Sequence, residues 1–143
     1  MEKNHVVLNT SLFDRKNSFS VFNHIKLELI EPDHAVISLD IRPESRNPYG
    51  FVHGGALYTM ADNATGYAAH TDGRCYVTQD STIHFLGNQA EGVIRADAHV
   101  RHRGRSTCLV DVDIFGDGEK LLATGEFTFF CVDREQLLQR AGK

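Results

Sequence analysis

The stretch HGGALYTMADNATGYAAH, residues 53–70, decides the fold, because it is the one segment with a long helical pattern. Its apolar residues recur at the three- and four-residue spacing of one helix face: Leu57, Met60, Ala61, Ala64 and Ala68. The opposite face is small and almost uncharged, and it holds Gly55, Thr59, Asp62, Thr65, Gly66 and Ala69. We therefore predict a helix from Gly55 to about His70 that is covered on both faces.

Strand patterns flank this helix on both sides. Before it, apolar and polar residues alternate over 25–29 and 35–41, and the turn at Glu31-Pro32-Asp33 between them predicts a hairpin. After a loop rich in proline and glycine and the helix itself, four more strand-like segments follow: 75–86, 92–103, 106–115 and 120–132. Five or six antiparallel strands and one long helix predict an α+β domain whose sheet wraps around the helix.

The length and composition indicate one soluble domain. A chain of 143 residues fits a single domain over 1–143, with an N-terminal segment at 1–20, where Asn9 or Thr10 is a candidate helix cap, and a charged tail at 133–143. The formal charge of −4 argues against a nucleic-acid partner, and no apolar run is long enough to span a membrane. The apolar run Val6-Val7-Leu8 is too short for a secretory signal, so we expect a cytoplasmic protein.

The sequence contains no recognisable metal motif. Its three cysteines, Cys75, Cys108 and Cys131, are widely spaced and form no Cys-x-x-Cys pair, which favours reduced thiols in the core. None of the eight histidines forms a His-x-x-x-His pair, and His84 and His99 are expected to be solvated or hydrogen-bonded on strands. A Gly-x-Ser-x-Gly elbow is also absent from the sequence. We expect a site that needs no metal.

Two features at the helix could carry chemistry. His53-Gly54-Gly55 places glycines at the helix start, where unpaired N–H groups and the helix dipole favour a developing oxyanion. Asp62 is a carboxylate in a helix of apolar and small residues, and desolvation there would suit a general base. Simpler interpretations remain open: a flexible N-cap, a structural histidine, and an aspartate on a wet helix face.

These residues lie within a larger resemblance. The segment 47–55, with Ala61-Asp62 after it, resembles the signature of PaaI-like hotdog-fold acyl-CoA thioesterases. The resemblance continues through residues 78–86 and the hairpin at 102–107, and it covers roughly 20–132. It implies a hotdog fold, in which an antiparallel sheet wraps around one long central helix.

The resemblance implies a role for each matching position. Asp62 matches the acidic residue that activates water or attacks the thioester carbonyl, and Gly54 matches the glycine whose N–H polarises that carbonyl. Asn47 and His53 match polar residues that position the thioester and the helix start. Thr78 falls where relatives have Ser or Thr to orient the water, although the length of the loop 70–74 affects this register.

The resemblance also implies partners. Two subunits of such proteins pair with their helices facing, so Asp62 and Asn47 of one site come from different chains, and dimers of dimers are common. The small residues on this helix face allow the helix of a second subunit to come close. One of them, Gly55, is also a candidate for contact with the bound substrate. Arg101, Arg103 and Arg105 are candidates for contacts to the phosphates of coenzyme A, with solvated surface arginines as the alternative.

The resulting hypothesis is hydrolysis of acyl-CoA, or of acyl-carrier-protein, thioesters by a homodimer or homotetramer. No cofactor is expected beyond the coenzyme A of the substrate. Two other classes stay open: a hotdog enoyl-thioester hydratase or dehydratase, for which no matching His and acid motif is present, and a non-catalytic acyl-CoA binding module. The sequence does not identify the acyl group.

Overall fold

The computed structural model describes residues 17–132, 135, 139–140 and 142. The candidate helix cap at Asn9 or Thr10 lies outside the described residues, as does most of the tail at 133–143. Along the described part of the chain, no helix is long and apolar enough to cross a membrane.

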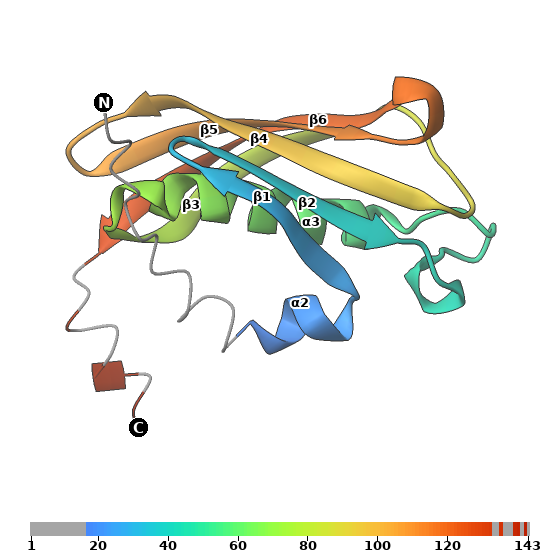
Figure 1. The fold of residues 1–143 in the computed structure, drawn as a ribbon, viewed down its shortest axis with the longest axis horizontal. Coiled ribbons are helices and arrows are strands. Elements are labelled where there is room, and N and C mark those ends of the chain that lie inside the picture. The colour runs from blue at the N-terminus through green and yellow to red at the C-terminus, as the bar shows by residue number, and fades with distance from the viewer. Residues whose placement is uncertain (1–16, 133–134, 136–138, 141, 143) are drawn as a thin grey trace, which may run out of the picture.

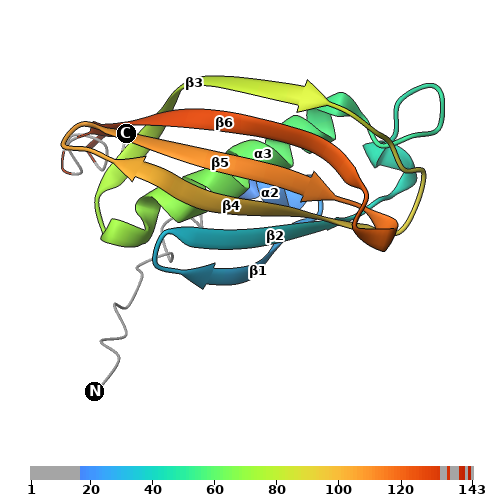
Figure 2. The ribbon, with the colours of Figure 1, turned by 90° about the horizontal axis from the view of Figure 1, so that it is seen from above.

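Six antiparallel strands form one sheet in the order β1-β2-β4-β5-β6-β3 (Figure 2). The strands are β1 (Ile25–Glu31), β2 (His34–Asp40), β3 (Cys75–Phe85), β4 (Val93–Arg103), β5 (Thr107–Phe115) and β6 (Leu121–Val132). Each boundary lies within two residues of the predicted segment, and the largest difference is at the end of β1, which continues through Glu31. The hairpin turns where expected, and Asp33 in that turn adopts a positive φ of 62°.

Helix α3 (Gly54–Ala69) crosses one face of this sheet (Figure 1). All five residues of its predicted apolar face are buried: Leu57, Met60, Ala61, Ala64 and Ala68. The inward residues of the central strands meet them: Ala35, Ile37, Leu39, Ile94, Ala96, Ala98, Val110, Val112, Ile114 and Phe127. The alanines on β2 and β4 let the helix approach the sheet closely. The predicted α+β architecture is therefore confirmed.

The second face of α3 is covered only along part of its length. Thr65, Gly66 and Ala69 are buried within the chain, as the sequence predicts for this face. Asp62 is half-buried, however, and Gly55 is exposed. The N-terminal half of α3 is thus open on the side that carries the candidate chemistry.

A short helix, α2 (Ser18–Phe22), packs against α3 through polar contacts. The side chains of Asn17 and Ser20 both donate to Asn63 Oδ1, at 2.9 and 2.6 Å. Asn63 in turn donates to the Thr59 carbonyl 2.8 Å away. These bonds satisfy a buried amide and attach α2 to the middle of α3.

Strand β3 lies at one edge of the sheet and has only β6 as a described neighbour. It is 11 residues long, and most of its side chains are exposed, including the apolar Val77 and Phe85. A long edge strand with exposed apolar residues is a template for pairing with another chain. This edge lies beside the open part of α3 (Figure 2).

Candidate active site

The start of α3 is capped by His53. Its ring Nδ1 accepts a hydrogen bond from the Gly55 N–H at 2.8 Å, and its carbonyl accepts from Ala56 and Leu57. His53 is therefore the helix N-cap, and the bond leaves Nδ1 as its acceptor nitrogen. Among the described residues, nothing accepts a hydrogen bond from the Gly54 N–H. One amide at the positive end of the helix remains free to bind an oxygen.

The glycine at position 54 leaves room for that oxygen. A Cβ added at Gly54 would meet only the Phe85 ring, at an ordinary 3.7 Å. The surrounding side chains therefore tolerate a methyl group at position 54. The glycine instead keeps the surface beside its N–H uncovered. An added Cβ at Gly55, by contrast, would lie 3.0 Å from His53 Nδ1, so a side chain there would disturb the cap.

A pocket of about 330 Å³ opens beside this amide. It is lined by Asn47, Val52, Gly54, Leu57, Phe85, Leu86, Gly87 and Asn88. Asn47 Oδ1 accepts from the N–H groups of Tyr49 and Phe51, at 3.0 and 3.2 Å, and so shapes the preceding loop. The side-chain NH₂ of Asn47 donates no hydrogen bond to any described residue. The pocket combines free donors from Asn47 and Gly54 with apolar walls.

Asp62 lies two turns further along α3 and contacts strand β3. The Thr78 hydroxyl donates a hydrogen bond to Asp62 Oδ1 at 2.7 Å. The nearby Tyr58 hydroxyl is hydrogen-bonded to Ser81 on the same strand. The structure thus brings two of the predicted site residues, Thr78 and Asp62, into contact, whereas the sequence did not reveal the bond between Tyr58 and Ser81.

The structure thus forms two half-sites. Gly54 and Asp62 are eight residues apart on one helix, which puts them about 12 Å apart along its axis. A reacting carbonyl that touches the Gly54 amide is too far from the Asp62 carboxylate of the same chain. Asn47, His53 and Gly54 form one group, and Asp62 and Thr78 form the other.

A model of the thioesterase superfamily matches residues 49–123, which include both half-sites except for Asn47. The chain belongs to the thioesterase superfamily.

Individual relatives agree with this assignment. The acyl-coenzyme A thioesterase PaaI of Escherichia coli (strain K12) is 32% identical over 100 residues, which span 68% of this chain and 71% of that protein. The structure of the E. coli PaaI protein superposes with a TM-score of 0.84 at 25% identity and covers 87% of this chain and 91% of that one. The fold is therefore the hotdog fold of PaaI-like thioesterases.

A second relative was solved with a ligand. A hypothetical thioesterase from Streptococcus pneumoniae TIGR4, in complex with coenzyme A, is 29% identical with a TM-score of 0.79. The match covers 86% of this chain and 96% of the streptococcal chain.

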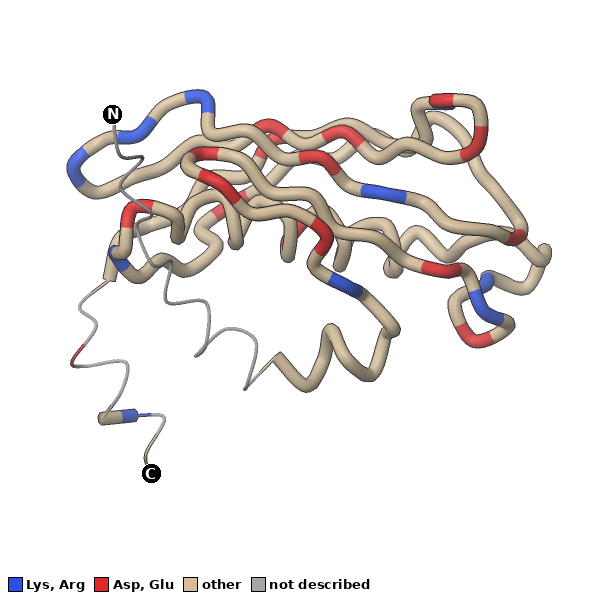
Figure 3. Tube along the Cα trace, viewed as in Figure 1, with Lys and Arg blue, Asp and Glu red and all other residues tan. Residues whose placement is uncertain are grey.

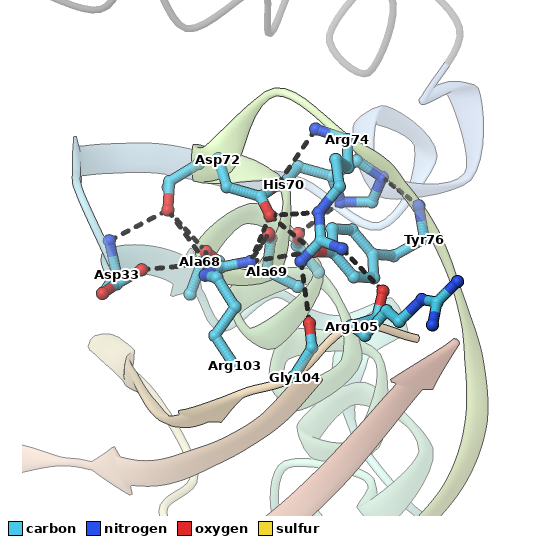
Figure 4. Close-up of polar contacts among 12 residues, drawn as sticks. Asp33, Ala68, Ala69, His70, Asp72, Arg74, Tyr76, Arg103, Gly104 and Arg105 are labelled. Carbon is cyan, nitrogen blue, oxygen red and sulfur yellow. Dashed lines mark hydrogen bonds and ion pairs between the residues drawn. The ribbon is translucent and has the colours of Figure 1, made fainter. Parts of the chain in front are cut away.

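The three arginines of the β4–β5 hairpin point in different directions. Arg101 pairs with Asp111 on the outer face of the sheet at 3.0 Å. Arg103 turns inward to the end of α3 (Figure 4). Arg105 is exposed and extends away from that cluster, and its side chain has no partner among the described residues. Arg105 is therefore the member of this hairpin whose charge is free for a phosphate.

Arg103 closes the C-terminal end of the helix. Its Nη1 donates to the Ala69 carbonyl at 2.8 Å, and its Nη2 donates to the Ala68 carbonyl at 3.3 Å. The same guanidinium pairs with Asp33 at 2.9 Å and with Asp72 at 3.0 Å. A cation at the negative end of the helix dipole, bonded to its last carbonyls, is strongly stabilising.

Tyr76 completes this cluster. Its hydroxyl accepts from Arg103 at 3.0 Å and donates to Asp72 at 2.6 Å. Desolvation and the bond to Asp72 raise the pKa of Tyr76 to about 12, so the hydroxyl keeps its proton. Sequence analysis missed this cluster, because its members come from the β1–β2 turn, the end of α3, β3 and β4.

We expect Arg103→Ala to lower the free energy of unfolding by about 2–3 kcal/mol, because it leaves two helix carbonyls and the Asp33 carboxylate without their partner and removes one of the two arginines paired with Asp72. Urea denaturation measures this change. The matched control is Arg105→Ala on the same hairpin, which should change the value by no more than about 0.5 kcal/mol. Equal losses in the two variants would contradict the capping role.

Proposed function

We propose that this chain hydrolyses acyl-CoA thioesters to a free acid and coenzyme A. The observation that carries the proposal is the pairing of the Asp62 carboxylate with Thr78, on a helix whose first free amide, at Gly54, faces an open pocket. A carboxylate that can activate water and an amide that can stabilise an oxyanion are the two parts that thioester hydrolysis needs.

In this proposal the thioester carbonyl oxygen accepts the Gly54 N–H, and the Asn47 NH₂ contacts the thioester from the same pocket. The helix dipole and the preorganised amide stabilise the negative charge that develops on the oxygen. His53 holds the first turn of α3 in place through Gly55.

Asp62 acts on the carbonyl carbon, as a base or as a nucleophile. As a base it takes a proton from water while the water oxygen bonds to the carbonyl carbon. The tetrahedral intermediate then expels the CoA sulfur, which receives that proton and leaves as the thiol. Thr78 is placed to orient the carboxylate or the water.

The proposed site is completed by a second copy of the chain. The separation of about 12 Å between Gly54 and Asp62 requires that the two half-sites of one catalytic centre come from different chains. The open edge of β3 and the exposed Tyr58 and Val77 supply a surface for this pairing. A dimer, or a tetramer of two such dimers, follows from this arrangement.

The relatives support both the substrate class and the residues. The E. coli relative is an acyl-coenzyme A thioesterase, and the streptococcal relative was solved with coenzyme A. That streptococcal protein was also crystallised with an aspartate and with a threonine replaced by alanine. These two residues are separated by the same number of positions as Asp62 and Thr78, which agrees with a joint role.

Asp62→Asn should lower kcat for thiol release by at least about 100-fold, because it removes the base or nucleophile while keeping the side-chain shape. Thr78→Ala should lower kcat about tenfold through loss of one hydrogen bond to a charged group. The measurement is steady-state thiol release over a panel of acyl-CoA and acyl-carrier-protein substrates.

The matched control is Asp40→Asn, which removes an exposed carboxylate at the end of β2 and should retain full activity. Wild-type activity in Asp62→Asn would refute the mechanism. Water addition to an enoyl-CoA without thiol release would instead identify a hydratase, and tight binding without turnover would identify a binding module.

Arg105→Ala should raise KM for acyl-CoA while changing kcat by less, because a phosphate contact far from the reacting carbonyl contributes uniform binding. Arg101 and Arg103 were the other candidates for this contact, but Arg101 is paired with Asp111 and the Arg103 guanidinium is already bonded at the helix end. An unchanged KM in Arg105→Ala would remove this residue from the proposed phosphate site.

A further inference from the structure

A cluster of metal-ligating side chains lies on the face of the sheet opposite α3. It consists of His34 on β2 with Asp97 and His99 on β4. Antiparallel pairing places His34 directly opposite His99, and both flank the inward pair Ala35 and Ala98. One potential ligand atom from each of the three residues lies within 4.8 Å of the others.

The ligand atoms converge on one point. His34 Nε2 lies 2.7 Å from Asp97 Oδ1, and His99 Nε2 lies 3.0 Å from the same oxygen. The two imidazole rings stack with centroids 4.0 Å apart and 12° between their planes. Ligands at about 2.0–2.1 Å from a tetrahedral Zn²⁺ are about 3.3 Å apart, so a few tenths of an ångström of opening would admit the ion.

A fourth residue orients the cluster. Glu31 Oε1 lies 2.8 Å from His34 Nδ1, on the side of the ring away from Asp97. A carboxylate that accepts from Nδ1–H fixes the tautomer in which Nε2 offers its lone pair, and this is the usual outer partner of a metal-bound histidine. A protonated His34 donates from both ring nitrogens, to Glu31 and to Asp97. A metal ion bound at Nε2 would take the place of the proton on the side of Asp97.

The surroundings favour a cation. Figure 3 shows acidic positions along the strands of the sheet. Asp111 and Asp113 on β5 pair with His99 and Asp97, and Glu126 on β6 pairs with Asp111. Asp111 Oδ2 is bonded to Arg101, but its Oδ1 is buried without a hydrogen-bond partner among the described residues. Arg101 is paired with Asp111, and Arg95, two residues before Asp97 on β4, is paired with Glu119, so neither arginine is ion-paired with Asp97.

We infer that His34, Asp97 and His99 form a binding site for a divalent transition metal such as Zn²⁺, with Glu31 as the positioning residue for His34. Two imidazoles and a carboxylate suit Zn²⁺, Ni²⁺ and Cu²⁺, and the half-exposed cluster leaves room for water as a further ligand. When the metal binds a protonated His34, the Nε2 proton leaves to solvent as the nitrogen–metal bond forms. This site lies on the opposite face of the sheet from the proposed catalytic residues and does not depend on them.

Isothermal titration of the tag-free chain with zinc chloride at neutral pH should show one Zn²⁺ per chain. His99→Ala and Asp97→Asn should each weaken binding at least about tenfold, and Glu31→Gln should weaken it about tenfold with unchanged stoichiometry. With Cu²⁺ as the probe, electron paramagnetic resonance should show hyperfine splitting from two imidazole nitrogens, and from one in His99→Ala.

Two controls test the location. His84→Ala removes an exposed histidine from the same face, and Cys75→Ser removes a half-buried thiol, so both should bind Zn²⁺ as the wild type does. Equal affinity in His99→Ala, Asp97→Asn and the wild type would overturn the inference, as would the absence of saturable Zn²⁺ binding in folded wild-type protein.

Discussion

The burial of α3 against the sheet is the constraint on which the rest of this structure depends. Its apolar face meets the inward residues of β2, β4 and β5, and each fully buried large side chain such as Leu57 or Met60 contributes roughly 1.5–3 kcal/mol. Hydrogen bonds also fix both helix ends, to His53 at the first turn and from Arg103 at the last carbonyls. A helix held in this way has little freedom to slide or rotate.

That rigidity determines how the chemistry is arranged. A fixed helix presents its free amide at one end and its carboxylate two turns later, and the distance between them cannot shrink within one chain. The open half of α3 and the unpaired edge of β3 lie on the same side of the fold (Figure 2). The proposed catalytic centre thus lies where the sheet leaves part of the helix uncovered.

Local patterns allowed much of this fold to be predicted. The helical period of residues 53–70 and the alternation in the strands are set by short stretches of chain, and the glycines and prolines mark the turns. The resemblance supplied Asp62 and Thr78 as separate candidates, and the structure places them in contact. The prediction that the small helix face is covered was only partly correct, because the chain buries Thr65 and Gly66 but leaves Gly55 exposed.

Contacts between distant segments could not be predicted in the same way. The role of Arg103 at the helix end depends on a carbonyl 34 residues away and a carboxylate 70 residues away. His34 and His99 meet only through the register of β2 with β4, which a search for histidine spacing along the chain does not detect. Both clusters are products of strand pairing, and they become visible only when the sheet is assembled.

The most direct test of the divided site is complementation between two inactive variants. Gly54→Pro removes the amide hydrogen. Residue 54 is the first position of α3, where proline is tolerated, and the ψ of 138° at His53 suits a residue that precedes proline. Gly54→Ala keeps the amide hydrogen, and its added Cβ makes only an ordinary contact of 3.7 Å with the Phe85 ring, so it serves as the control.

Gly54→Pro and Asp62→Asn should each release almost no thiol alone. Refolded together in equal amounts, they should recover about a quarter of wild-type activity, because half of the dimers are mixed and each mixed dimer has one intact site. Mixed dimers that form but remain inactive would contradict a catalytic centre shared between two chains.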